Sequence, residues 1–192
     1  MSGPASVARR LLFVGLLAAV LGPLAGSARA AVSRGMHVGG FANGANWGVG
    51  RLGRITDTGI NFALLYRYHI TGALSAGMEV RRIDYGATAA SGTESDVELD
   101  SYALIGRWDV LPKSDLRPHL VCGVSSNRFK RKVVLGRSTS ESSSYKPGGS
   151  VAIGLDRDFG KGWTVGGQFR YLHVGSDINA LGLRLVISFR FA

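Results

Sequence analysis

Residues Leu181 to Phe191 read LGLRLVISFRF, and this stretch near the C-terminus decides the fold. Every odd-numbered position is a large apolar residue, whereas the even-numbered positions hold Gly, Arg, Val, Ser and Arg. A period of two residues indicates a β-strand with one apolar face and one mainly polar face. The stretch alone leaves open whether the apolar face turns toward the core of a soluble protein or toward lipid.

Further segments alternate in the same way and bring the expected number of strands to eight. They lie at residues 31–42, 60–69, 74–81, 101–110, 117–124, 150–156 and 163–171. Glycines in the first segment obscure which of its faces is outward. The connections alternate between long and short, which is typical of bacterial outer-membrane barrels. We therefore predict an all-β fold, an eight-stranded antiparallel up-and-down transmembrane β-barrel that is apolar outside and polar inside.

The N-terminus has the layout of a secretory signal peptide. Arg9 and Arg10 precede an apolar run from Leu11 to Leu21, and small residues around Ala30 suit a cleavage site. We predict a signal peptide over residues 1–30 and a mature barrel domain over residues 31–192, with an uncleaved anchor as the alternative. No later run reaches the 18 apolar residues of a membrane-spanning helix. The expected location is the outer membrane of a Gram-negative cell, and an even number of strands places both termini in the periplasm.

Aromatic residues cluster near the two expected rims of the barrel, as the girdles of outer-membrane barrels do. The periplasmic set is Tyr66, Tyr68, Trp108, Trp163, Phe189 and Phe191, and the outer set is Tyr85, Tyr102 and Tyr171. In a secreted β-sandwich or a lipocalin-like barrel, these residues would face a core instead. Those two soluble folds are the structural alternatives.

Charge and cysteine content limit the partners. The chain carries a formal charge of +10, of which Arg9, Arg10 and Arg29 lie in the predicted signal peptide. An exported protein rarely meets nucleic acid, so the expected partners are outer-membrane lipids, including lipopolysaccharide. Cys122 is the single cysteine, which excludes an intramolecular disulfide, and the histidines show no metal-binding spacing. We expect no cofactor, no metal and a monomeric chain.

The segment from Gly162 to His173, with its Phe-Arg-Tyr motif at Phe169, and the closing strand to Phe191 resemble a known family. They are similar to the small outer-membrane barrel superfamily that includes OmpA-type transmembrane domains and the OmpX and Ail group. Members of that family end on the aromatic residue, whereas here Ala192 follows it. The resemblance implies a porin-like barrel inserted by the outer-membrane assembly machinery, without a cofactor.

Charged residues recur in the inward phase of the expected strands. They are Arg67, Glu79, Arg81, Arg107, Asp109, Arg117, Asp156, Arg170, Arg184 and Arg190. The interior of an eight-stranded barrel is just wide enough to be filled by side chains, so we expect these groups to form an ion-pair network rather than line a wide pore. Because arginines outnumber carboxylates, a narrow anion-permeable channel is an alternative.

The long connections, expected at Asn43–Asp57, Gly86–Glu98 and Ser125–Lys146, suggest a structural or surface-interaction role that is adhesin-like. The third connection carries a basic group of Arg128, Lys130, Arg131, Lys132 and Arg137. These cations suit contact with lipopolysaccharide phosphates or an anionic polymer. A solvated loop without a ligand is the alternative.

One enzyme class shares the expected fold, the lipid A acyl hydrolases of the PagL type. His173, Ser176 and Asp177 lie where a lipid-facing base and nucleophile would be needed. That family reads His-x-Ser-Asn, whereas here two residues separate the histidine from the serine. The extra residue changes the side of the strand that the serine occupies, so we expect no enzymatic activity and keep the hydrolase as the runner-up.

Overall fold

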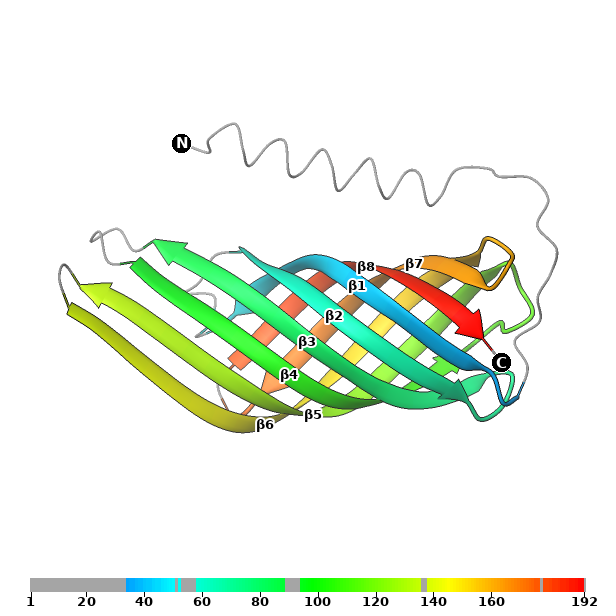
Figure 1. The fold of residues 1–192 in the computed structure, drawn as a ribbon, viewed down its shortest axis with the longest axis horizontal. Helices are drawn as coiled ribbons and strands as arrows, with labels where there is room; N and C mark the ends of the chain where they lie inside the picture. Colours follow the sequence, from blue (N-terminus) through cyan, green and yellow to red (C-terminus); the bar gives the residue numbers. More distant parts are fainter. Residues whose placement is uncertain are drawn as a thin grey trace, which may run out of the picture.

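The computed structural model describes residues 34–50, 52, 58–88, 94–135, 138–176 and 178–191. These residues form eight strands that close into one antiparallel barrel in chain order (Figure 1). The strands are β1 His37–Val49, β2 Thr58–His69, β3 Leu74–Thr88, β4 Glu94–Asp109, β5 Leu116–Leu135, β6 Ser138–Asp158, β7 Trp163–Val174 and β8 Ile178–Phe191. The predicted fold class is confirmed, while the predicted signal peptide lies outside the described residues. None of the described residues belongs to a helix long and apolar enough to cross a membrane.

Pairing of the first strand with the last closes the barrel. The β1–β8 register runs from His37 opposite Phe191 to Val49 opposite Asn179, and β1 also pairs with β2 over almost its whole length. Within the closed part of the barrel every strand has a neighbour on both sides, so the sheet presents no edge there. A closed barrel is one of the two architectures that satisfy the backbone inside a bilayer.

The two ends of the barrel differ. We call the end where β1 begins and β8 ends the terminal rim, and the end where β5 meets β6 the hairpin rim. At the terminal rim the turns are short: Thr71 accepts hydrogen bonds from the amides of Ala73 and Leu74, at 3.2 and 2.9 Å. In the turn after β6, the Asp158 side chain accepts from the amide of Gly160, which has the positive φ that glycine tolerates.

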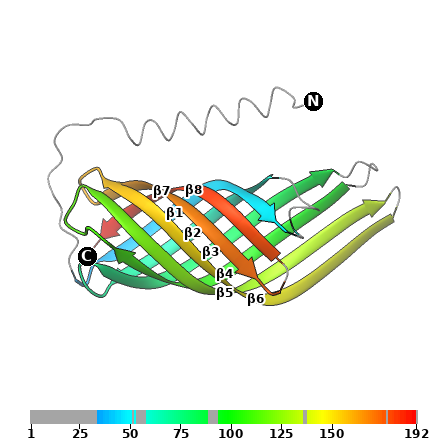
Figure 2. The ribbon, with the colours of Figure 1, turned by 180° about the vertical axis from the view of Figure 1, so that it is seen from behind.

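Three stretches expected to be loops include strand segments, and for those segments the prediction is wrong. β1 continues to Val49, β3 extends to Thr88, and β4 begins at Glu94. β5 runs to Leu135 and β6 begins at Ser138, so these two strands form one long hairpin. The hairpin extends furthest from the barrel, and β7 and β8 end well short of its tip (Figure 2). Alternation of apolar residues identifies only the part of a strand that faces lipid. The serine-rich strand segments beyond it lack this alternation, so the predicted strands ended too early.

Side chains alternate between the two faces along the parts of the strands that form the barrel wall. On β4, for example, Leu104 is 65% exposed on the outside and the next residue, Ile105, is 6% exposed. The outward apolar residues form a continuous belt, which we call the apolar band. Toward the hairpin rim it ends at Val80 and Tyr102, and the next outward positions on the same two strands are Arg82 and Asp100.

Tyr85 does not belong to an outer girdle, contrary to the sequence-based expectation. It is 2% exposed and points into the barrel, because it continues the inward phase of Arg81 and Ile83 on β3. Tyr102 and Tyr171, by contrast, are exposed on the outer wall.

Candidate functional site

The interior is built in layers, and the layer nearest the hairpin rim is apolar. We call this group the apolar layer; it comprises Leu52, Ile83, Tyr85, Val97, Leu99, Leu172, Val174, Ile178 and Ala180, with Phe129 packed against it. The sequence analysis expected a polar interior throughout, and that expectation is wrong at this end. Most of these residues follow the inward phase of strands whose polar inward residues lie deeper. Their burial against one another excludes water from the lumen near the hairpin rim.

Below the apolar layer, Glu79 is surrounded by three arginines. Its carboxylate accepts hydrogen bonds from Arg170 at 2.6 and 3.1 Å and from Arg184 at 2.8 Å. The guanidinium of Arg81 lies 3.4 Å from the same carboxylate. Gln168 accepts two hydrogen bonds from Arg184, at 3.0 and 2.8 Å. One carboxylate therefore joins β3, β7 and β8 across the lumen.

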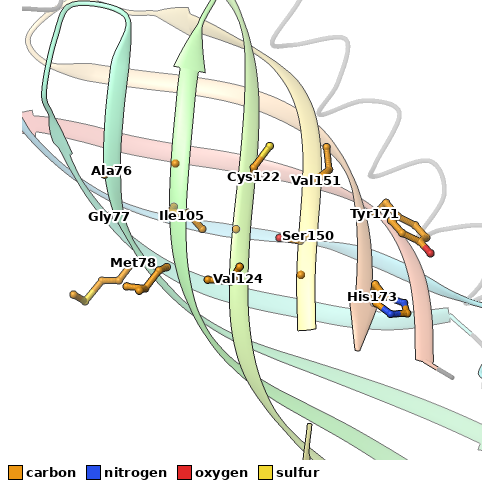
Figure 3. A pocket seen from close by; sticks show the side chains of 14 residues that line it. Ala76, Gly77, Met78, Ile105, Cys122, Val124, Ser150, Val151, Tyr171 and His173 are labelled. Carbon is orange, nitrogen blue, oxygen red and sulfur yellow. The ribbon is translucent and has the colours of Figure 1, made fainter. Parts of the chain in front are cut away.

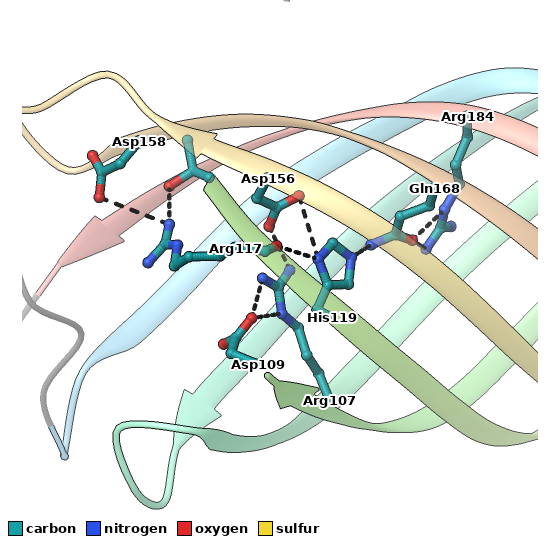
Figure 4. A network of polar contacts seen from close by, with 9 residues as sticks. Arg107, Asp109, Arg117, His119, Asp156, Asp158, Gln168 and Arg184 are labelled. Atoms are coloured by element: carbon teal, nitrogen blue, oxygen red, sulfur yellow. Dashed lines mark hydrogen bonds and ion pairs between the residues drawn. The ribbon is translucent and has the colours of Figure 1, made fainter. Parts of the chain in front are cut away.

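A second cluster, centred on Arg107, lies nearer the terminal rim (Figure 4). Arg107 donates to Asp156 at 2.6 Å and to Asp109 at 2.8 Å. The Asp156 side chain lies against Gly166 on β7. A Cβ atom at position 166 would collide with the Asp156 carboxylate, so the glycine leaves space for it. His119 lies 3.8 Å from Asp156 and 2.9 Å from Gln168, so it connects the two clusters.

A third cluster completes the polar interior at the terminal rim. Arg117 lies 3.7 Å from Asp158 and donates to Thr164 at 3.2 Å, while Arg190 also pairs with Asp158. The sequence analysis did not include Asp158, His119 or Gln168 in the network. For Asp158 the available signal was its even position, in the inward phase of Asp156.

All ten charged residues expected in the lumen are buried in the structure. Nine of them belong to the three clusters, and Arg67 lies beside the second and third. With the apolar layer above them, these groups fill the barrel from the terminal rim to the hairpin rim. This arrangement is typical of a lumen filled by side chains rather than a water-filled pore.

The outward face of β3, β4 and β5 above the apolar band carries a mixed charge patch. Arg82 pairs with Glu98 at 2.7 Å and Asp84 at 3.0 Å, and Lys130 pairs with Glu98 at 3.2 Å and Asp100 at 3.4 Å. Partial burial alone would raise the pKa of Glu98, but the hydrogen bond from Lys130 and the charge of Arg82 hold it below its ordinary value. The same hydrogen bond raises the pKa of Lys130.

The predicted basic group is therefore divided by the structure. Arg128 and Lys130 are half-buried on the outward face, where Lys130 is neutralised by carboxylates. Arg131 and Lys132 are exposed on the hairpin, and Arg137 lies outside the described residues. The acidic partners on β4 escaped the sequence analysis because Glu98 and Asp100 were assigned to a loop or its border instead of a paired strand.

A shallow groove of about 930 Å³ crosses the apolar band (Figure 3). Its floor is a row of small outward residues, Ala76, Gly106 and Cys122, which face each other in register on β3, β4 and β5. Larger residues such as Met78 and Val124 border it on the side of the hairpin rim. The three floor residues are exposed on the outside of the wall, so the groove opens outward.

His173, the candidate base of the hydrolase alternative, lines one end of this groove. Its Nδ1 lies 2.7 Å from Oδ1 of Asn179, which also accepts a hydrogen bond from Tyr171 at 2.8 Å. The hydrogen-bond partner of the His173 imidazole is thus Asn179, which lies on β8 across the β7–β8 turn. Ser176 is exposed after the end of β7, and Asp177 lies outside the described residues.

Within the described ranges, no group of three or more His, Cys, Asp or Glu side chains could hold a metal ion. A closed barrel with an apolar outer band and a charged, filled interior defines a transmembrane β-barrel of the outer-membrane type. The family model for the outer membrane protein β-barrel domain matches residues 15–191. The chain belongs to this family, and this membership supports an outer-membrane location.

Solved structures agree on the fold. Ail, the attachment invasion locus protein of Yersinia pestis, superposes with a TM-score of 0.63 at 13% identity, covering 82% of this chain and 99% of that one. Neisserial surface protein A gives 0.60 at 21% identity, covering 81% and 97%. A major outer membrane protein of Thermus thermophilus gives 0.59 at 13% identity, covering 81% and 99%. No curated protein sequence matches the chain significantly. The predicted resemblance to small outer-membrane barrels is confirmed.

Proposed function

We propose that the protein acts as a closed, monomeric barrel whose β5–β6 hairpin binds phosphate- or sulfate-bearing saccharides at the cell surface. Both termini lie in the periplasm in this proposal, because short turns face the periplasm and long hairpins the outside in bacterial outer-membrane barrels. The outer-membrane assembly machinery would insert the chain.

The observation that carries the proposal is the length of the hairpin above a filled lumen. β5 and β6 stay paired from Asn127 opposite Lys146 to Leu135 opposite Ser138, all beyond the apolar band. At the rise of a β-strand this extension is roughly 25 Å long. An ordered structure of that reach offers a surface outside the membrane, whereas the interior offers no wide passage.

The chemistry of the ligand follows from the cations that the hairpin leaves exposed. Arg131 and Lys132 are exposed, while Arg82 and Lys130 are held by neighbouring carboxylates. Arginine and lysine attract phosphate and sulfate groups, and arginine can do so with two parallel hydrogen bonds. A structure of Ail in complex with the heparin analogue sucrose octasulfate superposes on this chain with a TM-score of 0.58 at 15% identity. A barrel of this shape can thus carry a site for a sulfated saccharide.

Binding measurements on the folded protein in uncharged lipid nanodiscs test the proposal. The probes are heparin and purified lipopolysaccharide, and the variant is Arg131→Glu/Lys132→Glu. The variant should bind the preferred probe at least about tenfold more weakly, because each basic group near an anionic surface contributes about 1 kcal/mol. Added salt should weaken binding by the wild type.

The matched control is Lys113→Glu/Lys161→Glu, which reverses two exposed charges at the terminal rim. It should bind like the wild type. Equal losses in both variants would show attraction to overall charge instead of the hairpin, and unchanged binding in the hairpin variant would refute the proposal.

A further inference from the structure

The lumen holds more positive than negative charge. Among the described residues, seven buried arginines share four buried carboxylates, Glu79, Asp109, Asp156 and Asp158. Uncompensated charge away from bulk water is costly, because desolvation of an ion is repaid only by a partner of opposite sign. A barrel with this interior needs either counterions or a very polar local environment.

Among the described residues of the lumen near the terminal rim, Arg67 is the arginine with no carboxylate at ion-pair distance, although Asp156 and Asp109 attract its charge from further away. Arg107 is held by Asp109 and Asp156, and Asp158 is shared by Arg117 and Arg190. Arg67 is 5% exposed, and within the described part of the chain its guanidinium forms no ion pair and its Nε no hydrogen bond. Its charge is therefore the one left over in this part of the lumen.

A small cavity of about 10 Å³ lies beside Arg67. Two further donors without a partner belong to residues that line it: Nε of Arg117 and, in the tautomer that protonates it, Nδ1 of His69. The hydroxyls of Thr164 and Ser188 also lie in its lining. The space accommodates a particle about the size of a water molecule. The carboxylates of Asp109 and Asp156 line it too. Arg107 pairs with Oδ1 of Asp109 and Oδ2 of Asp156, while Oδ1 of Asp156 lies against Gly166 and has no hydrogen bond.

We infer that this cavity is a binding site for one small monovalent anion, of which chloride is the physiological example. The anion neutralises Arg67 and accepts hydrogen bonds from Arg67, Arg117 and His69. A single water molecule would satisfy some of these donors but would leave the extra charge in place. The anion is a structural component of the plug, not a permeating ion, since the apolar layer closes the path toward the hairpin rim.

The test compares unfolding of the full barrel in detergent micelles in sodium chloride and in sodium gluconate at equal ionic strength. Gluconate is too large for the cavity. Chloride should raise the unfolding midpoint of the wild type in a saturable way, as a ligand of the folded state does. Arg67→Met should lose this dependence and should unfold later than the wild type in gluconate, because it removes an uncompensated buried charge. The surface variant Arg82→Gln should keep the chloride dependence.

Crystals of the wild type grown in sodium bromide supply a second readout that requires no variant. An anomalous peak beside Arg67 is the expected result. Equal midpoints in chloride and gluconate, or bromide crystals without a peak in the cavity, would each overturn the inference in favour of water.

Discussion

Glu79 and Arg170 face each other across the full width of the barrel and form a bidentate ion pair. The two guanidinium nitrogens of Arg170 lie 2.6 and 3.1 Å from the carboxylate oxygens of Glu79. Glu79 lies on β3 and Arg170 on β7, and these strands are four positions apart in either direction around the barrel. The pair therefore joins opposite walls, and it does so at a depth where Arg81 and Arg184 contact the same carboxylate.

Glu79→Gln should strongly destabilise the barrel. The substitution keeps the shape of the side chain but leaves three buried arginines without a counter-charge, and breaking a buried pair in this way costs about 3–5 kcal/mol. Urea unfolding in lipid vesicles measures the change. Asp84→Asn, which breaks an exposed pair with Arg82, serves as the control and should cost less than about 1 kcal/mol. Similar losses in the two variants would contradict the central role of Glu79.

The wild-type protein should show no discrete conductance steps in planar bilayers. Two barriers lie in series along the lumen, the charged clusters and the apolar layer around Ile83, Leu99 and Leu172. Glu79→Gln should also remain closed, because it leaves the apolar layer intact. Reproducible steps in wild-type recordings would favour the narrow anion-permeable channel instead, and a wide porin in the same membranes confirms that openings are detectable.

The extent to which the sequence predicts this molecule depends on what each position faces. The stretch from Leu181 to Phe191 reveals its strand and its faces because lipid selects apolar residues at every second position. The segment from Ser140 to Tyr145 gives no such signal, since its side chains are exposed on both faces, and its strand was missed. Tyr85 followed the inward phase of its strand, and applying that phase beyond Arg81 would have placed it inside.

The partners within the lumen are a different matter. Sequence phase indicates that Glu79 and Arg170 both point inward, but not that they meet. Their contact depends on the barrel register, which brings together residues 91 positions apart. Asp158 and the anion site at Arg67 likewise emerge from three-dimensional neighbours on β2, β5, β6 and β8.

Leu104→Arg should destabilise the protein in lipid vesicles by up to about 2–4 kcal/mol, the cost of an arginine on the lipid face at the bilayer midplane. Leu104 is exposed on the apolar band, one outward position from its edge at Tyr102, so the charge would enter hydrocarbon. Free energies of unfolding from urea titrations measure the effect. Ser142→Arg, on the exposed hairpin, should change stability little. A tolerated arginine at position 104 would argue that this face meets water.

The pKa of Glu98 should lie below its ordinary value of 4.5, and carbon-13 NMR of the side-chain carboxyl checks it. Because the folded-state pKa is lowered, the ion pairs of Glu98 contribute stability above pH 4.5 and lose it as the pH falls through the folded-state value. Because the folded-state pKa of Lys130 is raised, its ion pairs contribute their full stability below pH 10.5, the ordinary pKa of lysine. They lose this contribution as the pH rises through the folded-state pKa. The variant Arg82→Gln/Lys130→Gln should return the Glu98 midpoint toward 4.5. A midpoint already at 4.5 in the wild type would mean that the patch is not formed in solution.

Lipid A from cells that express the protein should keep all of its acyl chains. An acyl hydrolase needs a base within hydrogen-bonding reach of its nucleophile. Here Nδ1 of His173 lies 2.7 Å from the amide oxygen of Asn179, an acceptor that orients the imidazole but supplies no nucleophile. Mass spectrometry of lipid A from cells with the wild type and with an empty vector provides the comparison. Loss of an acyl chain that His173→Ala and Ser176→Ala both abolish would establish the hydrolase and replace the surface-binding proposal.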